Sequence, residues 1–216
     1  MGIPFHEQEH HHKTIQGTEP MKKIALIAAL TLLPLTGFAE GNIKAEDARL
    51  PDLMKSTKEA VDPMPEKLKT LLVSEITANG AVKAIEVCSV KAPAMAKAAS
   101  EKTGWEIKRV SLKNRNPKGS ADKWEKSAIK GFEQALATNS DAVLEKGEIV
   151  TIKGKEYFRY AKGLKTAKEC LTCHGKEETI SKEIKEKLKE VYPNDRATGY
   201  DLNQVRGIIS VTRAIK

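Results

Sequence analysis

Hydrophobic positions recur along the first half of the chain at the spacing of helices. Between residues 66 and 78 the apolar side chains fall at steps of three and four, which places them on one helix face. The pattern ends at Gly80. Pro63 and Pro65 separate it from a short helical pattern around residues 43–58. The shared face consists of Leu68, Leu71, Leu72 and Ile76.

The same spacing predicts a second helix over residues 81–102. Its apolar stripe is Ile85, Cys88, Ala92, Met95 and Ala99. Pro93 lies inside this stretch, so we expect a kink or a split there, because proline lacks the amide hydrogen that a helix interior needs. Gly104 ends the helix.

Strand patterns begin after this helix. Residues 105–112 alternate between apolar and polar side chains, as a half-buried strand does. A loop containing Asn116-Pro117 follows, and residues 121–138 return to a helical pattern. The apolar positions of that third helix are Trp124, Ala128, Phe132 and Leu136.

The last third of the chain predicts a hairpin, a helix and a strand. Residues 148–152 and 156–161 alternate on either side of a turn at Lys153-Gly154. Ser181 can cap a helix that ends at Pro193, and residues 205–215 are a strand candidate. The stripe of the capped helix is Ile184, Leu188 and Val191.

Helices first and then strands with inserted helices are typical of the α+β class. We therefore predict one antiparallel sheet with helices packed on one side. A polar N-terminal arm, residues 40–64, precedes a domain that covers residues 65–216.

The N-terminal residues carry an export pattern. Residues 1–20 are polar and without periodicity, as in a leader outside the native protein. Residues 21–39 have two lysines, an apolar run of about a dozen residues and small residues before a cleavage point after Ala39, which predicts a secretory signal peptide and a periplasmic protein. The alternative is an uncleaved anchor, but the run is short of the roughly 20 residues that span a bilayer. We expect no membrane span after cleavage.

The formal net charge is +8, and residues 1–39 carry three bases and three acids, so the excess belongs to the exported part. A basic surface suits acidic redox partners or an anionic membrane, although a mixed lysine and glutamate surface also serves solubility alone. Nucleic acid is excluded as a partner by export.

Histidine and cysteine counts narrow the chemistry. Of five histidines only His174 lies after the cleavage point, and it follows the pair Cys170 and Cys173 in the stretch "ECLTCHG". The third cysteine is Cys88. The upstream histidines are His6, His10, His11 and His12.

The arrangement C-x-x-C-H has three readings. A structural zinc site needs four ligands, which the three cysteines and His174 can just supply, but adjacent Cys173 and His174 chelate one tetrahedral ion poorly. A redox dithiol belongs at a helix start in a βαβ setting, which the surrounding pattern lacks. Covalent haem c fits best: two thioether bonds, with the adjacent histidine as the iron ligand. One motif predicts one haem.

Three stretches resemble a known family: "NRNPKG", "YAKGLKTAKECLTCHG" and "YPNDRATGYDLNQVRGIISV". They are similar to exported single-haem proteins with a PAS-like domain, long catalogued as a domain of unknown function. The similarity covers roughly residues 65–216 and implies a PAS-like antiparallel sheet with flanking helices. It also implies that histidine and cysteine are the axial iron ligands, here His174 and Cys88.

The residues themselves leave the second axial ligand open. An odd cysteine in an oxidising compartment needs an explanation, but a free cysteine is also among the most commonly buried residue types. No second histidine competes for the iron in the exported part. The remaining candidates are a lysine, an open position, or one of Met54, Met64 and Met95, of which Met95 shares the Cys88 stripe. Thiolate ligation would lower the reduction potential, and its loss on reduction would open the iron to CO or NO.

Other residues are candidates for the haem pocket. Arg115 or Arg206 can pair a haem propionate, because arginine suits carboxylates, or can be solvated surface residues. Aromatic side chains can pack on the porphyrin or simply belong to the core. The aromatic candidates are Tyr192, Tyr200, Tyr157 and Trp124.

Function divides into two main classes. A PAS-like haem domain can sense redox state or a diatomic gas through a signalling partner, or it can transfer electrons between periplasmic proteins; a fold alone does not decide between them. An enzyme is the weaker hypothesis, because no second histidine and no spaced carboxylate pair offers acid–base chemistry.

Overall fold

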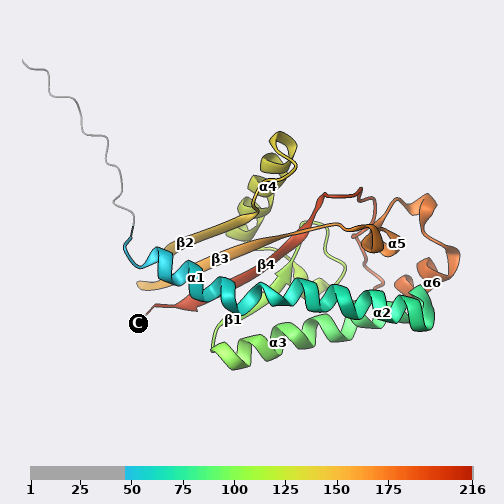
Figure 1. Ribbon diagram of the computed structural model, residues 1–216, viewed down its shortest axis with the longest axis horizontal. Coiled ribbons are helices and arrows are strands. Elements are labelled where there is room, and N and C mark those ends of the chain that lie inside the picture. Colours follow the sequence, from blue (N-terminus) through green and yellow to red (C-terminus); the bar gives the residue numbers. More distant parts are fainter. Residues whose placement is uncertain (1–46, 216) are drawn as a thin grey trace, which may run out of the picture. The chain divides into compact units, whose positions relative to one another are not determined.

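We describe residues 47–215 of a computed structural model (Figure 1). The leader and the signal peptide expected over residues 1–39 lie outside this range and remain predictions. Within it, no helix is long and apolar enough to cross a membrane.

Four strands form a single antiparallel sheet in the order β1-β4-β3-β2. β2 and β3 make a hairpin whose turn residues Lys153 and Gly154 have positive φ angles of 51° and 77°, the geometry that two-residue hairpins favour. Both hairpin strands are longer than the sequence pattern predicted. The strands are β1 (Glu106–Val110), β2 (Glu145–Ile152), β3 (Lys155–Lys165) and β4 (Val205–Ala214).

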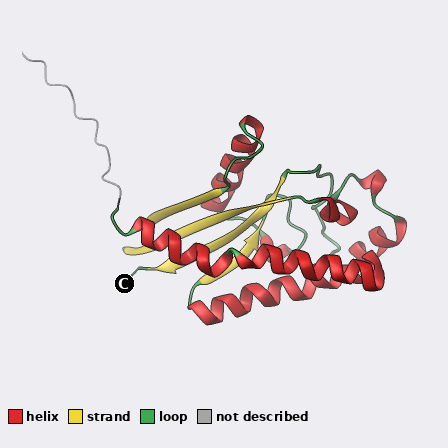
Figure 2. Cartoon of the chain, viewed as in Figure 1, coloured by secondary structure: helices red, strands yellow, loops and turns green. Residues whose placement is uncertain are grey.

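Helices lie on both sides of the sheet (Figure 2). A π-helical segment, Val87–Lys91, joins the second helix to the third, and short 3₁₀ turns precede and follow the fifth. The α-helices are α1 (Leu50–Val61), α2 (Pro63–Glu86), α3 (Ala92–Thr103), α4 (Lys123–Thr138), α5 (Leu171–His174) and α6 (Lys182–Val191). The 3₁₀ turns are Pro117–Gly119, Lys168–Cys170 and Glu177–Thr179.

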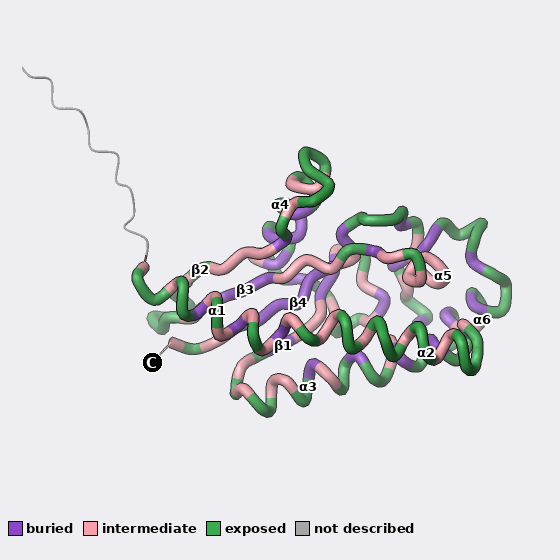
Figure 3. The backbone as a smooth tube through the Cα atoms, viewed as in Figure 1, coloured by how far each residue is buried: buried purple, intermediate pink, exposed green. Residues whose placement is uncertain are grey.

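The expectation that helices pack on one side only is wrong. Adjacent strand residues point to opposite faces, so Ile208 of β4 enters a core with α4 while Ile209 enters a core with α1 and α3. The α4 core contains Val110, Ala128, Ile129, Phe132, Ala161 and Ile208. The opposite core, on what we call the inner face, contains Leu53, Val61, Ile107, Phe158, Tyr160, Ile209 and Val211. The run of buried residues from Gly207 to Val211 in β4 reflects this burial on two faces (Figure 3).

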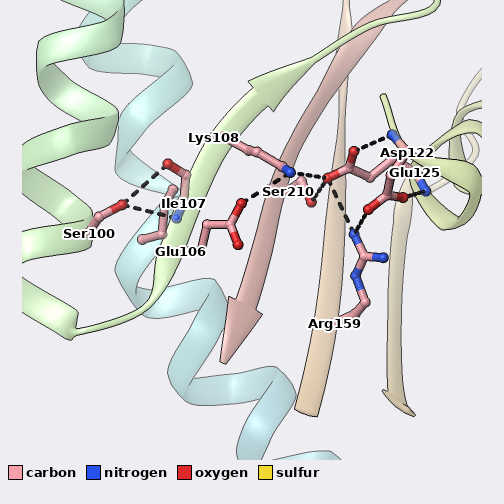
Figure 4. A network of polar contacts seen from close by, with 8 residues as sticks. All are labelled: Ser100, Glu106, Ile107, Lys108, Asp122, Glu125, Arg159 and Ser210. Atoms are coloured by element: carbon pink, nitrogen blue, oxygen red, sulfur yellow. Dashed lines mark hydrogen bonds and ion pairs between the residues drawn. The ribbon is translucent and has the colours of Figure 1, made fainter. Parts of the chain in front are cut away.

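A buried polar network fixes α4 on the outer face (Figure 4). Glu125 is fully buried, accepts a hydrogen bond of 2.7 Å from Ser210, and lies 3.3 Å from both Lys108 and Arg159. Asp122 and Glu125 also form a capping box, which explains why α4 begins here.

The first helix belongs to the core. Residues 50–61, which the sequence placed in a polar arm, form α1, and Leu53 and Val61 are buried against the inner face. α1 ends before Pro63, where α2 begins, as the prolines predicted.

Two irregularities shape the long helical segment that follows. Gly80 breaks α2 with φ 81° and ψ 165°, at the position where the sequence predicted a helix end. The expected disruption near Pro93 is also confirmed: Pro93 lies in the first turn of α3, directly after the π-helical segment. α4, α6 and the cap of α6 at Ser181 agree with the sequence pattern. The α+β class, consistent with a PAS-like fold, is confirmed.

Candidate functional site

The main cavity of the described chain lies between α2, the π-helical segment and the inner face of the sheet. Its volume is about 610 Å³, and a second cavity of about 330 Å³ adjoins it. Cys88, His174 and Arg206 line both. These volumes lie within or near the range of small-molecule and cofactor sites.

One wall of the main cavity is an apolar helix face. Leu68, Leu72 and Ile76 of α2 line it, and none of them belongs to a buried core of residues 47–215. Leu71, which the spacing put on the same face, is 47% exposed instead. The helix therefore presents an apolar stripe to the cavity and only a small part of its surface to the protein core.

The C-x-x-C-H motif also lines the main cavity. Cys170 ends a 3₁₀ turn after β3, and Cys173 and His174 lie in the single-turn helix α5. A side chain at Gly175 would collide with the carbonyl of Leu171, since an added Cβ lies 2.5 Å from that oxygen. The amides of Gly199 and Tyr200 donate to the carbonyls of Gly175 and His174 and hold the motif in place.

The cysteine chemistry disfavours two of the three readings of the motif. None of the three cysteines forms a disulfide, and burial raises the pKa of the Cys170 thiol and raises that of the Cys173 thiol to about 11. A redox dithiol needs the opposite shift. Across residues 47–215 no three histidine, cysteine or acidic side chains converge to hold a metal ion, which argues against zinc.

His174 is oriented as a metal ligand. Its Nδ1 lies 2.6 Å from the carbonyl oxygen of Ala197, which can only accept, so Nδ1 carries the proton and Nε2 keeps its lone pair. Arg206 Nε, 3.3 Å from the same Nδ1, cannot donate to it at the same time, and the shorter contact decides the tautomer. Burial, with Arg206 and Arg115 nearby, holds the pKa of His174 well below its usual value, so the ring is neutral. The Tyr200 ring packs edge-on, 6.3 Å away.

A buried ion pair supports this arrangement. Arg115 is 7% exposed, and its Nε donates to Asp195 Oδ2 over 2.9 Å. Its Nη2 donates to the carbonyls of Cys173 and Ala197. Asp195 Oδ1 accepts from the amide of Ala197 over 2.8 Å. Arg115 thus ties the "NRNPKG" loop to the motif and to the carbonyl that orients His174.

Cys88 lies in the π-helical segment and lines both cavities. Met95 and Met64 line the main cavity as well, whereas Met54 does not and instead contacts Gly147. The structure therefore removes Met54 from the candidate ligands and leaves Cys88, Met95 and Met64 on the cavity wall.

The other expected pocket residues separate into two groups. Tyr192, Arg115 and Arg206 line the cavities, whereas Tyr200 packs behind His174 and lines neither. Trp124 lies on the outer face, where Arg159 stacks on its ring at 4.4 Å. Trp124 packs against the α4 core, whereas Tyr157 is half-buried and lines neither cavity.

Comparison with known proteins gives two findings. A family model described as Tll0287-like matches residues 39–213. The chain belongs to the Tll0287-like family. The crystal structure of the cyanobacterial heme-protein Tll0287 superposes with a TM-score of 0.58 at 21% sequence identity, covering 77% of this chain and 97% of that one. This likeness concerns the fold. No curated protein matches.

Sequence reasoning missed three residues of the candidate site. Arg109 lies on the inner face of β1, two positions from buried Ile107, and lines both cavities. A charged residue at a buried-face position of "WEIKRVSL" was the available signal. No signal in the sequence pointed to Asp195 and Ala197, because their contacts with Arg115 and His174 join segments that are far apart in the sequence.

Proposed function

We propose that this chain binds one haem c, joined through thioether bonds to Cys170 and Cys173, with Nε2 of His174 as an axial iron ligand. The observation that carries the proposal is the tautomer of His174: the Ala197 carbonyl accepts a hydrogen bond from Nδ1–H, which leaves the lone pair of Nε2 for a metal ion in the cavity-lining motif. The family match and the similar haem protein support it.

The described residues fit such a group. The apolar stripe of α2 offers aliphatic side chains to the cavity, and the two thiols line the same cavity. The three-residue spacing of Cys170 and Cys173 is that of covalent haem attachment. A bound haem would supply one-electron redox chemistry and affinity for small diatomic ligands.

We assign Cys88 as the second axial ligand, with Met95 as its rival. Cys88 stands on a π-helical segment, a distortion that is frequent at functional sites, and the sequence resemblance implies a cysteine here. A thiolate ligand would stabilise the oxidised iron and give a low reduction potential.

The role we propose is redox or gas sensing in the periplasm, with a separate signalling partner. Electron transfer between periplasmic proteins is the second candidate, because the basic charge of the chain suits acidic redox partners. Ligand exchange separates the two: a sensor releases Cys88 on reduction and then binds CO, whereas a carrier keeps both ligands in both states.

The first experiment is to express the full chain in a bacterium that attaches haem to exported proteins. Mass spectrometry of the mature protein should show cleavage after Ala39 and the added mass of one haem, and Cys170→Ala with Cys173→Ala should lose it. A mature wild-type protein without the haem mass would end the proposal.

The second experiment compares two ligand variants of the haem-loaded protein. Cys88→Ala should change the ferric optical and EPR spectra, and Met95→Leu, a volume-conserving control on the same cavity wall, should not. The reverse result would make Met95 the ligand. A ferrous wild-type protein that ignores CO would favour electron transfer.

A further inference from the structure

The cavity carries more positive charge than its own acids neutralise. Arg109, Arg115 and Arg206 all line it, and they are close enough to influence one another electrostatically. Asp195 is the carboxylate that pairs with one of them, Arg115. Among the described residues, one of these three guanidinium groups has a carboxylate partner, and Arg109 and Arg206 have none.

Of the other cations of the main cavity wall, Lys162 and Lys69 have acidic partners, whereas Lys165 donates to the carbonyl of Ser140 over 3.3 Å. Lys162 pairs with Asp62 and Glu145 over 3.1 and 3.0 Å, and Lys69 pairs with Glu169 over 3.4 Å. Among the described residues, Arg109 and Arg206 have no such carboxylate.

We propose that Arg109 and Arg206 bind the two propionate groups of the haem, a role that rests on the proposed function. Two propionates would give each of these two arginines a carboxylate partner, and the planar guanidinium matches carboxylate geometry. Arg115 is not one of the pair, because Asp195 and the carbonyls of Cys173 and Ala197 already bind it.

The two side chains are held differently. Nη1 of Arg206 donates to Ser111 Oγ over 3.0 Å and to the carbonyl of Lys113 over 3.3 Å, and its guanidinium lies 5.4 Å from the centre of the Tyr200 ring. These contacts fix the group and leave Nη2 for a ligand. Arg109 has no hydrogen bond to another side chain in residues 47–215, so its whole guanidinium is available.

The test uses the haem-loaded, exported full chain and four variants. Arg109→Gln and Arg206→Gln remove one charge each. Arg109→Lys keeps the positive charge but replaces the planar guanidinium group with an ammonium group. Arg213→Gln is the matched control, because Arg213 is on the same sheet face, contacts Trp105 and Ser56, and lines neither cavity. The midpoint potential at pH 8 and the propionate-bending bands of the resonance Raman spectrum are measured for each.

Removing a cation beside the haem stabilises the more positive ferric iron. Each cavity glutamine variant should therefore shift the ferric–ferrous equilibrium at least tenfold towards ferric, about 59 mV for one electron, and should move the propionate bands. Arg109→Lys should move the bands with a smaller change in potential. Arg213→Gln should alter neither.

Failure takes distinct forms. If wild-type protein carries no haem mass, the proposed function fails and this assignment fails with it. If haem is attached but Arg109→Gln resembles Arg213→Gln, Arg109 binds no propionate and the assignment alone is overturned. If Arg109→Gln does not accumulate as holoprotein, Arg109→Lys decides: unchanged propionate bands overturn the assignment.

Discussion

The pair formed by Arg115 and Asp195 offers the sharpest test of how the site is held. Both side chains are largely buried, at 7% and 15% exposure. Replacing Arg115 with methionine keeps a long side chain but leaves Asp195 without its cation and frees the carbonyls of Cys173 and Ala197. The substitution therefore removes the ion pair with Asp195 and, at the same time, the hydrogen bond that holds the Ala197 carbonyl beside His174.

The size of the effect follows from burial. Removing one partner of a buried ion pair costs about 3–5 kcal/mol, because the remaining charge is uncompensated. Asp195→Asn should cost less, about 1.5–3 kcal/mol, because the Ala197 amide keeps an oxygen to bind. The double variant should be less destabilised than the sum of the two, with a coupling of about 1 kcal/mol or more.

Urea unfolding of the full chain, followed by circular dichroism, measures these free energies. Arg115→Met should also lower Tm by about 6 °C or more, given about 2–4 °C per kcal/mol for a chain of this size. Arg49→Met is the control: Arg49 pairs with Asp47 and Glu156 but is 44% exposed, so its loss should leave the urea midpoint almost unchanged. Equal effects of Arg115→Met and Arg49→Met, or strictly additive effects at 115 and 195, would refute the reasoning.

Two further predictions concern the scaffold. Gly80→Ala should destabilise by about 1–3 kcal/mol, because Gly80 adopts a conformation that is essentially restricted to glycine; Gly131→Ala, in the interior of α4 with open space around it, should stabilise by about 0.5–1 kcal/mol. Equal thermal shifts for the two would contradict this. Glu125→Gln should cost about 1.5–3 kcal/mol in urea unfolding, because Arg159 and Lys108 then face an amide instead of a carboxylate; a change below about 0.5 kcal/mol would show that the network is dispensable.

Local patterns predicted the elements of this fold well. Periodicity identified α4 and α6, and the residues with special backbone demands, Gly80 and Pro93, marked the breaks in the long helical segment. These features depend on near neighbours in the chain. The prediction that helices cover only one side of the sheet was wrong. Nothing in "GIISV" alone says which helix packs on Ile208 and which packs on Ile209.

In the candidate site, too, features set by local sequence were predicted, and features that depend on long-range contacts were not. The C-x-x-C-H spacing is local, so the sequence alone identified it. The roles of Arg109, Arg115 and Asp195 depend on contacts between β1, the loop after it and the segment before β4. For Arg115 the sequence suggested a propionate partner, whereas the structure gives it Asp195 and two carbonyls.

The strand order has a consequence for the timing of maturation. β4 follows the other strands in the chain but lies between β1 and β3, so β1 has no neighbour in the sheet until residues 205–214 arrive. Pairings between such distant segments form slowly. The two thiols of the motif precede that last strand, and Arg206 comes with it. If a haem is attached as proposed, the attachment enzyme would meet the two thiols before β4 has completed the sheet, and β4 would then bring Arg206 to the cavity around the bound haem.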